Sequence, residues 1–162
     1  MRMNQNKIQI ATCEALGASA MAIPSPEVFS ALQQGVVDGQ DATLNFSTSQ
    51  KYFEVQKHIA LTYHQLSGTC FIMNARKFSR LPKEIQDAIV RANNEMEAWW
   101  QDYSIKEEDR LLKQWEEKGC QISRPELKPF QDAVQGVYKQ FADTVGGTAA
   151  IEKVRDIVAK NK

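Results

Sequence analysis

Apolar residues at helical spacing open the chain. They recur over residues 8–16 on one face and stop at Gly17, which predicts a helix that ends at the glycine. The apolar run over residues 20–24 has the length of a buried strand and leads into the next element. The first part of the chain is therefore expected to be a helix followed by a short strand.

A second helix and a second strand are predicted directly afterwards. Ser25 can cap this helix with its hydroxyl, and Pro26 suits the first helical position, where its missing N–H is not needed. Gly35 has the left-handed freedom that a helix end requires, and the β-branched pair Val36 and Val37 predicts a short strand after it. With a strand before the first helix, this order predicts an α/β layer of parallel strands.

Three separate stretches lie at the carboxyl ends of these predicted strands. They are residues 2–6, 24–25 and 41–43. Parallel strands end at one edge of a sheet, and ligands of open α/β sheets bind at that edge. The pattern therefore predicts a ligand site there, and Arg2 carries the positive charge that an anion would need.

The rest of the chain is expected to be mainly helical. The expected helices are 44–57, 82–118, 125–144 and 149–159, and the expected strands are 59–62, 69–73 and 120–123. Apolar residues of the long helix, from Ile85 to Tyr103, alternate steps of four and three, the spacing of a helix seam. A coiled-coil dimer is one interpretation of this seam. A loop through His64, Ser67 and Gly68 is a candidate hinge.

The composition argues against two classes of partner. The 162 residues include 20 basic and 20 acidic side chains, a formal net charge of zero. The usual electrostatic basis for binding nucleic acid or an anionic membrane is therefore absent. No apolar run approaches the roughly 18 residues of a membrane-spanning helix. We expect no nucleic acid partner and no membrane span within this chain.

Cysteine and histidine show no metal-binding or catalytic spacing. Cys13, Cys70 and Cys120 lack a CxxC pair and are interpreted as buried or idle thiols. His58 and His64 are accompanied by no HExxH pattern. We therefore expect no metal, no cofactor and no catalytic residue.

Two blocks of the sequence carry a resemblance to a known family. EVFSALQQGVVDGQD, followed by SQKYFEVQKHIALTYH, resembles the signature of the substrate-binding proteins of tripartite ATP-independent periplasmic (TRAP) transporters. EALGAS before these blocks and RLPKEIQDAI after them fall where that family has them. Family members run to roughly twice this length, so the resemblance covers essentially all of this chain but only the C-terminal half of the family's.

The resemblance implies a fold class. It is α/β, a periplasmic-binding-protein-like (type II) C-terminal lobe with a long spine helix, and the N-terminal lobe would be missing. The implied domains are an α/β ligand-binding lobe at 1–66, a crossover strand and spine helix at 67–118, and a C-terminal strand and helices returning to the lobe at 119–162. The strand at 69–73 and the first half of the spine would then lack partners, which predicts that the chain self-associates through these surfaces or leaves them mobile.

The resemblance also implies a set of ligand-binding residues. Arg2 would hold a carboxylate of the ligand, with the other contacts supplied by Asn6, Ser25, Asp41, Ala42 and Thr69. Many family members have an aromatic residue at the position of Ser25 and an asparagine at that of Ala42. Both residues are small here, so a wider cleft is expected.

The implied function is substrate binding for a TRAP transporter. Two lobes would close on a small organic carboxylate, without chemistry on it, and deliver it to the membrane permease subunits. The implied location is the periplasm, with a signal peptide in the missing half. The alternatives from other classes are a small α/β enzyme that uses Asp38, Asp41 or Cys70, and a helical assembly protein with residues 82–118 as its dimer seam.

Overall fold

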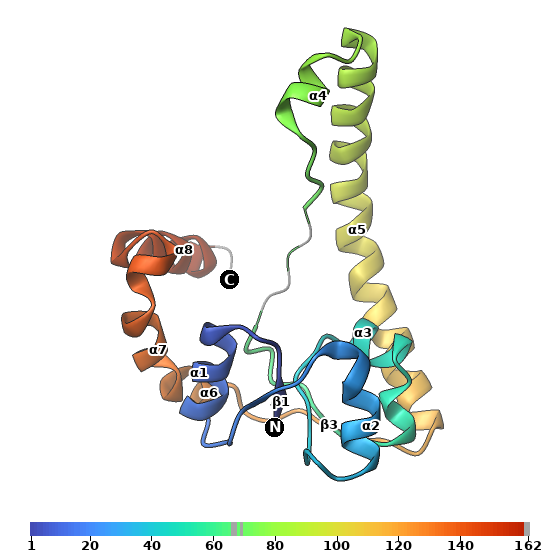
Figure 1. The fold of residues 1–162 in the computed structure, drawn as a ribbon, viewed down its shortest axis with the longest axis vertical. Helices are drawn as coiled ribbons and strands as arrows, with labels where there is room; N and C mark the ends of the chain where they lie inside the picture. Colours follow the sequence, from blue (N-terminus) through green and yellow to red (C-terminus); the bar gives the residue numbers. More distant parts are fainter. Residues whose placement is uncertain (66–67, 69, 161–162) are drawn as a thin grey trace.

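The computed structural model describes residues 1–65, 68 and 70–160. The elements in chain order are β1 (Arg2–Met3), α1 (Lys7–Ala15), β2 (Met21–Ala22), the 3₁₀ turn η1 (Ser25–Glu27), α2 (Val28–Gln33), α3 (Leu44–Ser49), η2 (Tyr52–Glu54), β3 (His58–Ala60), α4 (Ala75–Ser79), α5 (Lys83–Glu117), β4 (Gln121–Ser123), α6 (Lys128–Ala133), α7 (Gln135–Gln140), η3 (Ala142–Val145) and α8 (Thr148–Lys160). Figure 1 shows α1 to α3 in the lower part, α6 to α8 to one side, and α5 rising away from them.

β1 lies at the centre of a small parallel layer, as the alternation of helices and strands predicts. Arg2 pairs with Met21 of β2 in parallel register, and on its other side it forms a parallel bridge with Gln40. The helix predicted over 8–16 is present as α1 and ends before Gly17, which has the expected positive φ of 85°. These segments bring the carboxyl ends of three stretches to one edge.

The strand predicted at Val36 and Val37 is wrong. Gly35 ends α2 with a φ of 69°, and the Val36 N–H turns back to donate to the Ala31 carbonyl at 2.9 Å. This hydrogen bond completes a helix-ending motif and removes the Val36 amide from any ladder. The chain therefore reaches the parallel layer only at Gln40.

The hydrophobic core lies between α2, the η2 turn and the lower end of α5. Lys51 adopts a left-handed conformation (φ 56°), so the helix expected to continue to 57 ends at Ser49 instead. The turn that follows directs Tyr52 and Phe53 inward, where the Phe53 and Trp115 rings pack edge to face at 5.7 Å. Tyr52 and Phe53 are thus buried members of the core, and Phe46 packs against it. Its buried members are Ile23, Val28, Ala31, Leu32, Val37, Tyr52, Phe53, Trp115 and Cys120.

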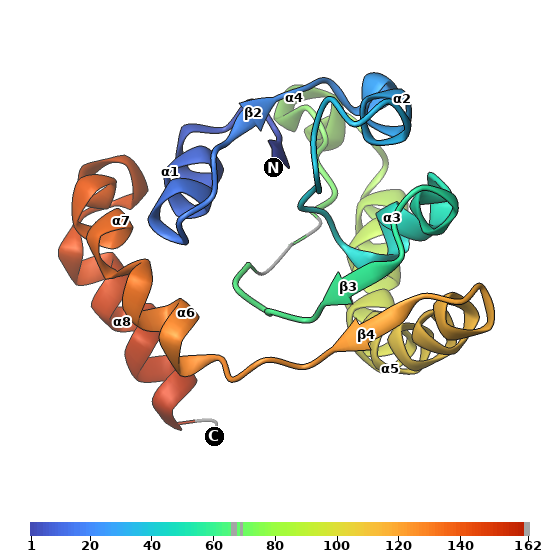
Figure 2. The same cartoon turned by 90° about the horizontal axis from the view of Figure 1, so that it is seen from below.

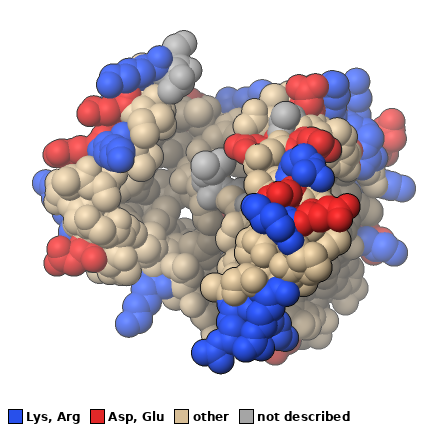
Figure 3. Space-filling view, turned by 90° about the horizontal axis from the view of Figure 1, so that it is seen from above, with Lys and Arg blue, Asp and Glu red and all other residues tan. Residues whose placement is uncertain are grey.

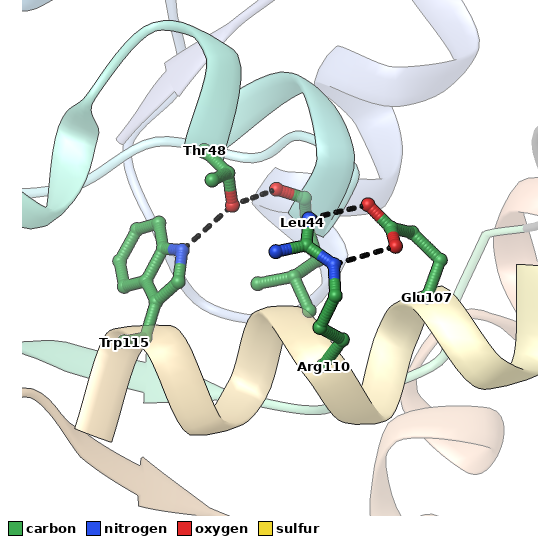
Figure 4. A network of polar contacts seen from close by, with 5 residues as sticks. All are labelled: Leu44, Thr48, Glu107, Arg110 and Trp115. Atoms are coloured by element: carbon green, nitrogen blue, oxygen red, sulfur yellow. Dashed lines mark hydrogen bonds and ion pairs between the residues drawn. The ribbon is translucent and has the colours of Figure 1, made fainter. Parts of the chain in front are cut away.

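The long helix predicted over 82–118 is confirmed as α5, with 35 residues. Its lower end packs on α3 and β4, and β4 pairs in parallel with β3 (Figures 1 and 2). Gly119 ends the helix with a φ of 76°. Figure 4 shows the polar contact at the α3–α5 junction: the Trp115 indole N–H donates to the Thr48 hydroxyl at 2.7 Å, and that hydroxyl donates to the Leu44 carbonyl.

The described part of the strand predicted at 69–73 is not a strand. Residues 70–73 are irregular, and Phe71 and Ile72 are 72% and 88% exposed. No described segment pairs with them, because β3 and β4 pair only with each other. Phe71, Ile72 and Met73 line one side of an apolar groove against the upper half of α5, whose Ile89 is also exposed. This part of the chain thus presents apolar side chains without a partner among the described residues.

The helix predicted over 125–144 is broken into α6, α7 and η3. Val134 is the last flanking residue of α6 and the first of α7, with ψ near zero. Gly136 follows in the first turn of α7 and lowers the helix propensity there. The bend places α7 against α1, as Figure 2 shows, and leads to α8, which the amphipathic pattern over 149–159 predicts.

Replacing Thr48 with valine should destabilise the chain. Valine keeps the shape of the side chain but leaves the indole N–H of Trp115, which is 2% exposed, without an acceptor. A buried donor that loses its partner costs about 1–3 kcal/mol in the free energy of unfolding, which urea denaturation measures. The matched control is Thr144→Val at an exposed position. Equal effects of the two substitutions would contradict a stabilising role for this contact.

Hydrogen exchange should distinguish the unpaired segment from the paired strands. The amides of Phe71 and Ile72 donate to no described acceptor, so they should exchange rapidly. The amides of Leu61 and Gln121, which donate to Ser123 and Lys57, should be protected. Comparable protection of both sets in a monomer would show that another element covers residues 70–73.

Candidate functional site

The side chain of Arg2 is the centre of the candidate site. Its backbone is held to the segment around Gln40 by two hydrogen bonds: its N–H donates to the Gly39 carbonyl at 2.7 Å, and its carbonyl accepts from the Asp41 N–H. The guanidinium is buried, with 1% of the residue exposed. Nε donates to the Ile23 carbonyl at 3.0 Å, and Nη2 donates to Asn4 Oδ1 at 2.8 Å. The strand thus fixes a long, flexible side chain in one direction.

The Arg2 guanidinium has no acidic partner in the described chain. Its acceptors are a carbonyl, an amide oxygen and a hydroxyl, all uncharged, and no carboxylate lies within ion-pair distance of it. Buried charges in proteins are usually paired with an opposite charge. Nη1 donates to none of the described groups and is not among the enclosed polar atoms. Two N–H groups of this buried cation therefore have no acceptor among the described residues.

Ser25 is beside Arg2 and does not cap the helix that its sequence context predicts. Its hydroxyl accepts from Arg2 Nη2 at 3.1 Å, and it makes no capping hydrogen bond. A 3₁₀ turn over Ser25–Glu27 precedes α2, and Pro24 occupies the flanking position. Because the Ser25 oxygen accepts from arginine, its own O–H stays free to donate. The predicted cap is therefore wrong, and the expected proximity of Ser25 to Arg2 is present.

Asn6 lies at the start of α1 and not beside the guanidinium. Its Oδ1 accepts from the N–H groups of Ile8 and Gln9 at 2.9 and 3.3 Å, so it caps the helix, and the residue is exposed. Asn4 instead supplies the amide oxygen that meets Arg2. Sequence reasoning missed Asn4, although side chains two residues apart share one face of a strand, which could have identified it.

Asp41 lies beside His64 at the same edge. His64 Nε2 is 3.5 Å from Asp41 Oδ1, and each side chain is 19% exposed. On the other side of the ring, Nδ1 is 2.6 Å from the Thr62 hydroxyl. The hydrogen bond to Asp41 raises the pKa of His64 above its ordinary value, although burial opposes the shift. Sequence reasoning considered His64 for metal binding, for catalysis and as part of a candidate hinge loop, and did not place it next to Asp41.

The remaining predicted residues are placed differently. Ala42 follows Asp41 and is half-buried, and Thr43 then caps α3 through its hydroxyl, which accepts from Phe46. Thr69 lies outside the described residues. The structure thus brings Arg2 and Ser25 into direct contact and joins Asp41 to them through the backbone of Arg2.

Other chemistry receives no support in the part of the chain that the structure describes. No group of three or more His, Cys, Asp or Glu residues could hold a metal there, and no described helix is long and apolar enough to cross a membrane. Cys13, Cys70 and Cys120 are free thiols; Cys13 and Cys120 are buried and Cys70 is exposed. Figure 3 shows acidic and basic side chains interspersed on one face, with a recessed and mostly uncharged surface between them.

Comparison with known proteins shows the family. Residues 1–144 match the family described as bacterial extracellular solute-binding protein, family 7. The chain belongs to this family of binding proteins, as the resemblance of its motifs predicts.

Two named relatives of this chain are periplasmic binding proteins. The chain is 29% identical over 147 residues to the sialic acid-binding periplasmic protein SiaP of Vibrio cholerae, covering 90% of this chain and 45% of that protein. It is 30% identical over 135 residues to the 2,3-diketo-L-gulonate-binding periplasmic protein YiaO of Escherichia coli, covering 83% of this chain and 41% of that protein.

A solved structure has the same fold over nearly the whole chain. It is a TRAP periplasmic solute-binding protein from Xanthobacter autotrophicus Py2 with bound β-D-galacturonate, with a TM-score of 0.85 and 25% identity. The match covers 98% of this chain and 52% of that protein. The expected fold class, a partial chain of a TRAP binding protein, is confirmed, and the chain spans about half the length of its relatives.

The Asp41–His64 pair should make stability depend on pH. The pKa of His64 is raised in the folded chain, so the pair stabilises fully below the unfolded value and loses this contribution as pH rises through the folded pKa. His64→Gln should therefore lower the free energy of unfolding by up to about 1 kcal/mol near pH 5.5, and by less near pH 8.5.

Urea denaturation at the two pH values measures this difference. His58→Gln, at an exposed position, is the control and should show no such dependence. A cost of His64→Gln that stays the same at both pH values would contradict an ionised pair.

Proposed function

We propose that this chain forms one wall of the ligand cleft in a TRAP-type binding protein, and that Arg2 anchors a small organic carboxylate there. The cleft closes on the ligand without chemistry, and the protein delivers it in the periplasm to membrane permease subunits. Within this arrangement residues 1–66 form the ligand wall, 67–118 cross toward a second lobe, and 119–162 return to the first. The named relatives are binding proteins rather than enzymes, which supports a role without catalysis.

The observation that carries the proposal is the buried, unpaired guanidinium of Arg2. A cation that is 1% exposed and meets only neutral acceptors among the described residues favours an anion as its missing partner. Carboxylates suit guanidinium because two oxygens match two N–H groups in one plane. The acids named for SiaP, YiaO and the Xanthobacter protein all contain a carboxylate.

The free donors at Arg2 suggest how the carboxylate binds. Nε and Nη2 already hold Ile23, Asn4 and Ser25, so Nη1 is the nitrogen that reaches the ligand. The free O–H of Ser25 can donate to the second carboxylate oxygen, or Ser25 can turn away and release an N–H of Nη2. The ligand therefore meets a donor pair in which Ser25 assists Arg2.

Substituting Arg2 should remove most carboxylate binding. One wall alone is expected to bind D-galacturonate in about the millimolar range, which NMR shifts of the Ser25 and Asp41 amides can follow. A hydrogen bond to a charged group contributes about 1.5–3 kcal/mol, so Arg2→Ala should weaken binding about 10- to 100-fold. Arg2→Lys should also bind poorly, because lysine keeps the charge but loses the planar fork.

The control is Arg91→Ala, which removes an exposed arginine from α5. Ser25→Ala should weaken binding by less than Arg2→Ala, and it leaves the buried guanidinium in place. Tryptophan fluorescence reports the buried Trp115 and shows whether each variant keeps its fold. A folded Arg2→Ala chain that binds within twofold of the unsubstituted chain would remove Arg2 from this role.

A further inference from the structure

The juxtaposition of Asp41 and His64 at the edge that holds Arg2 carries an inference about ligand charge. We propose that this pair makes the discrimination between singly and doubly charged acids depend on pH. The inference rests on the proposed function, because it assumes that Arg2 binds a carboxylate. It assigns to His64 a specificity-determining role that acts through Asp41.

The backbone links the Asp41–His64 pair to the edge of the sheet that carries Arg2. The Asp41 N–H donates to the Arg2 carbonyl at 3.2 Å, directly after Gln40 pairs with Arg2. The Asp41 carboxylate is partly exposed, so solvent and a ligand can reach it. His64 belongs to the segment after β3, where Tyr63 has an unusual positive φ of 42° and donates to Glu108 of α5 at 2.5 Å. The residue next to His64 is therefore attached to α5, and the imidazole itself lies between Asp41 and Thr62.

The surroundings of His64 accommodate both of its protonation states. With a neutral ring, Nε2–H faces Asp41 and Nδ1 accepts from the Thr62 hydroxyl. With a protonated ring, Nδ1–H donates to the same hydroxyl, which can act as donor or acceptor. Gain or loss of the proton thus leaves neither nitrogen unpaired. The charge at the edge can change without a rearrangement of its side chains.

Other charged groups near the pair are few in the described chain. Burial raises the pKa of the Cys13 thiol in α1. The Met1 ammonium opposes this shift, whereas Asp41 and Glu14 add to it. Asp41 is the charged group that raises the pKa of His64, through its hydrogen bond and its charge. Of these groups Asp41 is the one that contacts the imidazole, so the test substitutes His64 and Asp41 and leaves the others unchanged.

The charges of Arg2, Asp41 and His64 predict how the relative affinity for doubly and singly charged acids changes with pH. With His64 neutral, Arg2 and Asp41 cancel, and a second carboxylate near Asp41 is repelled. With His64 protonated, the edge gains one positive charge and this repulsion is offset. A doubly charged acid should therefore bind better relative to a singly charged acid as the pH falls. An exposed charge pair contributes up to about 1 kcal/mol, so the ratio of affinities should change about two- to fivefold.

The test uses fumarate and gluconate, which stay doubly and singly ionised over the range. Binding of each acid to the chain is measured by NMR at about pH 8.5 and about pH 5.5, on either side of the histidine range. The fumarate-to-gluconate affinity ratio should rise about two- to fivefold at the lower pH. His64→Gln should abolish this change, and His58→Gln should preserve it. Because His64→Gln leaves Met1 and Glu14 unaltered, the comparison isolates the Asp41–His64 pair.

The outcomes separate this inference from the proposed function. Arg2-dependent binding with the same affinity ratio at both pH values overturns the inference and leaves the proposed function standing. A pH-dependent ratio that persists in a folded His64→Gln chain also overturns it. Absence of binding of both acids at both pH values overturns the two together. Asp41→Asn provides a second check, because it should flatten the pH dependence and lower the pKa of His64 in its NMR titration.

Discussion

The buried guanidinium of Arg2 determines how the N-terminal layer is arranged. Removing a cation from water is costly unless polar groups replace the lost solvation. Three neutral acceptors do this in part, one each from Ile23, Asn4 and Ser25. They come from the residue directly after β1 and from the segment after β2, so the register of the parallel pair is linked to the position of the charge. The charge remains uncompensated by any described carboxylate.

Core packing and the ligand edge are connected through short segments. Gln40 bridges to Arg2 on one side and donates through its amide to Ser47 of α3, and α3 packs on α5 through the Thr48–Trp115 contact. The Tyr52 ring lies in the core with no exposed surface. The edge is therefore backed by the best-packed part of the molecule, which limits how far Arg2 can move when a ligand binds.

Sequence patterns predicted the parts of the fold that local rules determine. The limits of α1 and α5 follow from glycines and from apolar periodicity, and the family motifs identified Arg2 and Ser25. The errors arise where a different hydrogen bond replaces the one that the sequence pattern predicts. Val36 returns its amide to α2, and Ser25 gives its oxygen to arginine in preference to a helix end. The contact between His64 and Asp41 joins residues 23 positions apart, which no local pattern can show.

Because α5 is one continuous helix, a rotation at one end displaces the other end. Its 35 residues span about 52 Å at 1.5 Å per residue, with only the lower end packed in the core. A rotation of about 5° at the packed end would displace the far end by about 4–5 Å over that length. A rotation of this size is small for the core contacts near Trp115. At α4, beside the far end of the helix, it becomes a displacement of several ångströms. Small motions beside the ligand edge are amplified with distance along a single helix.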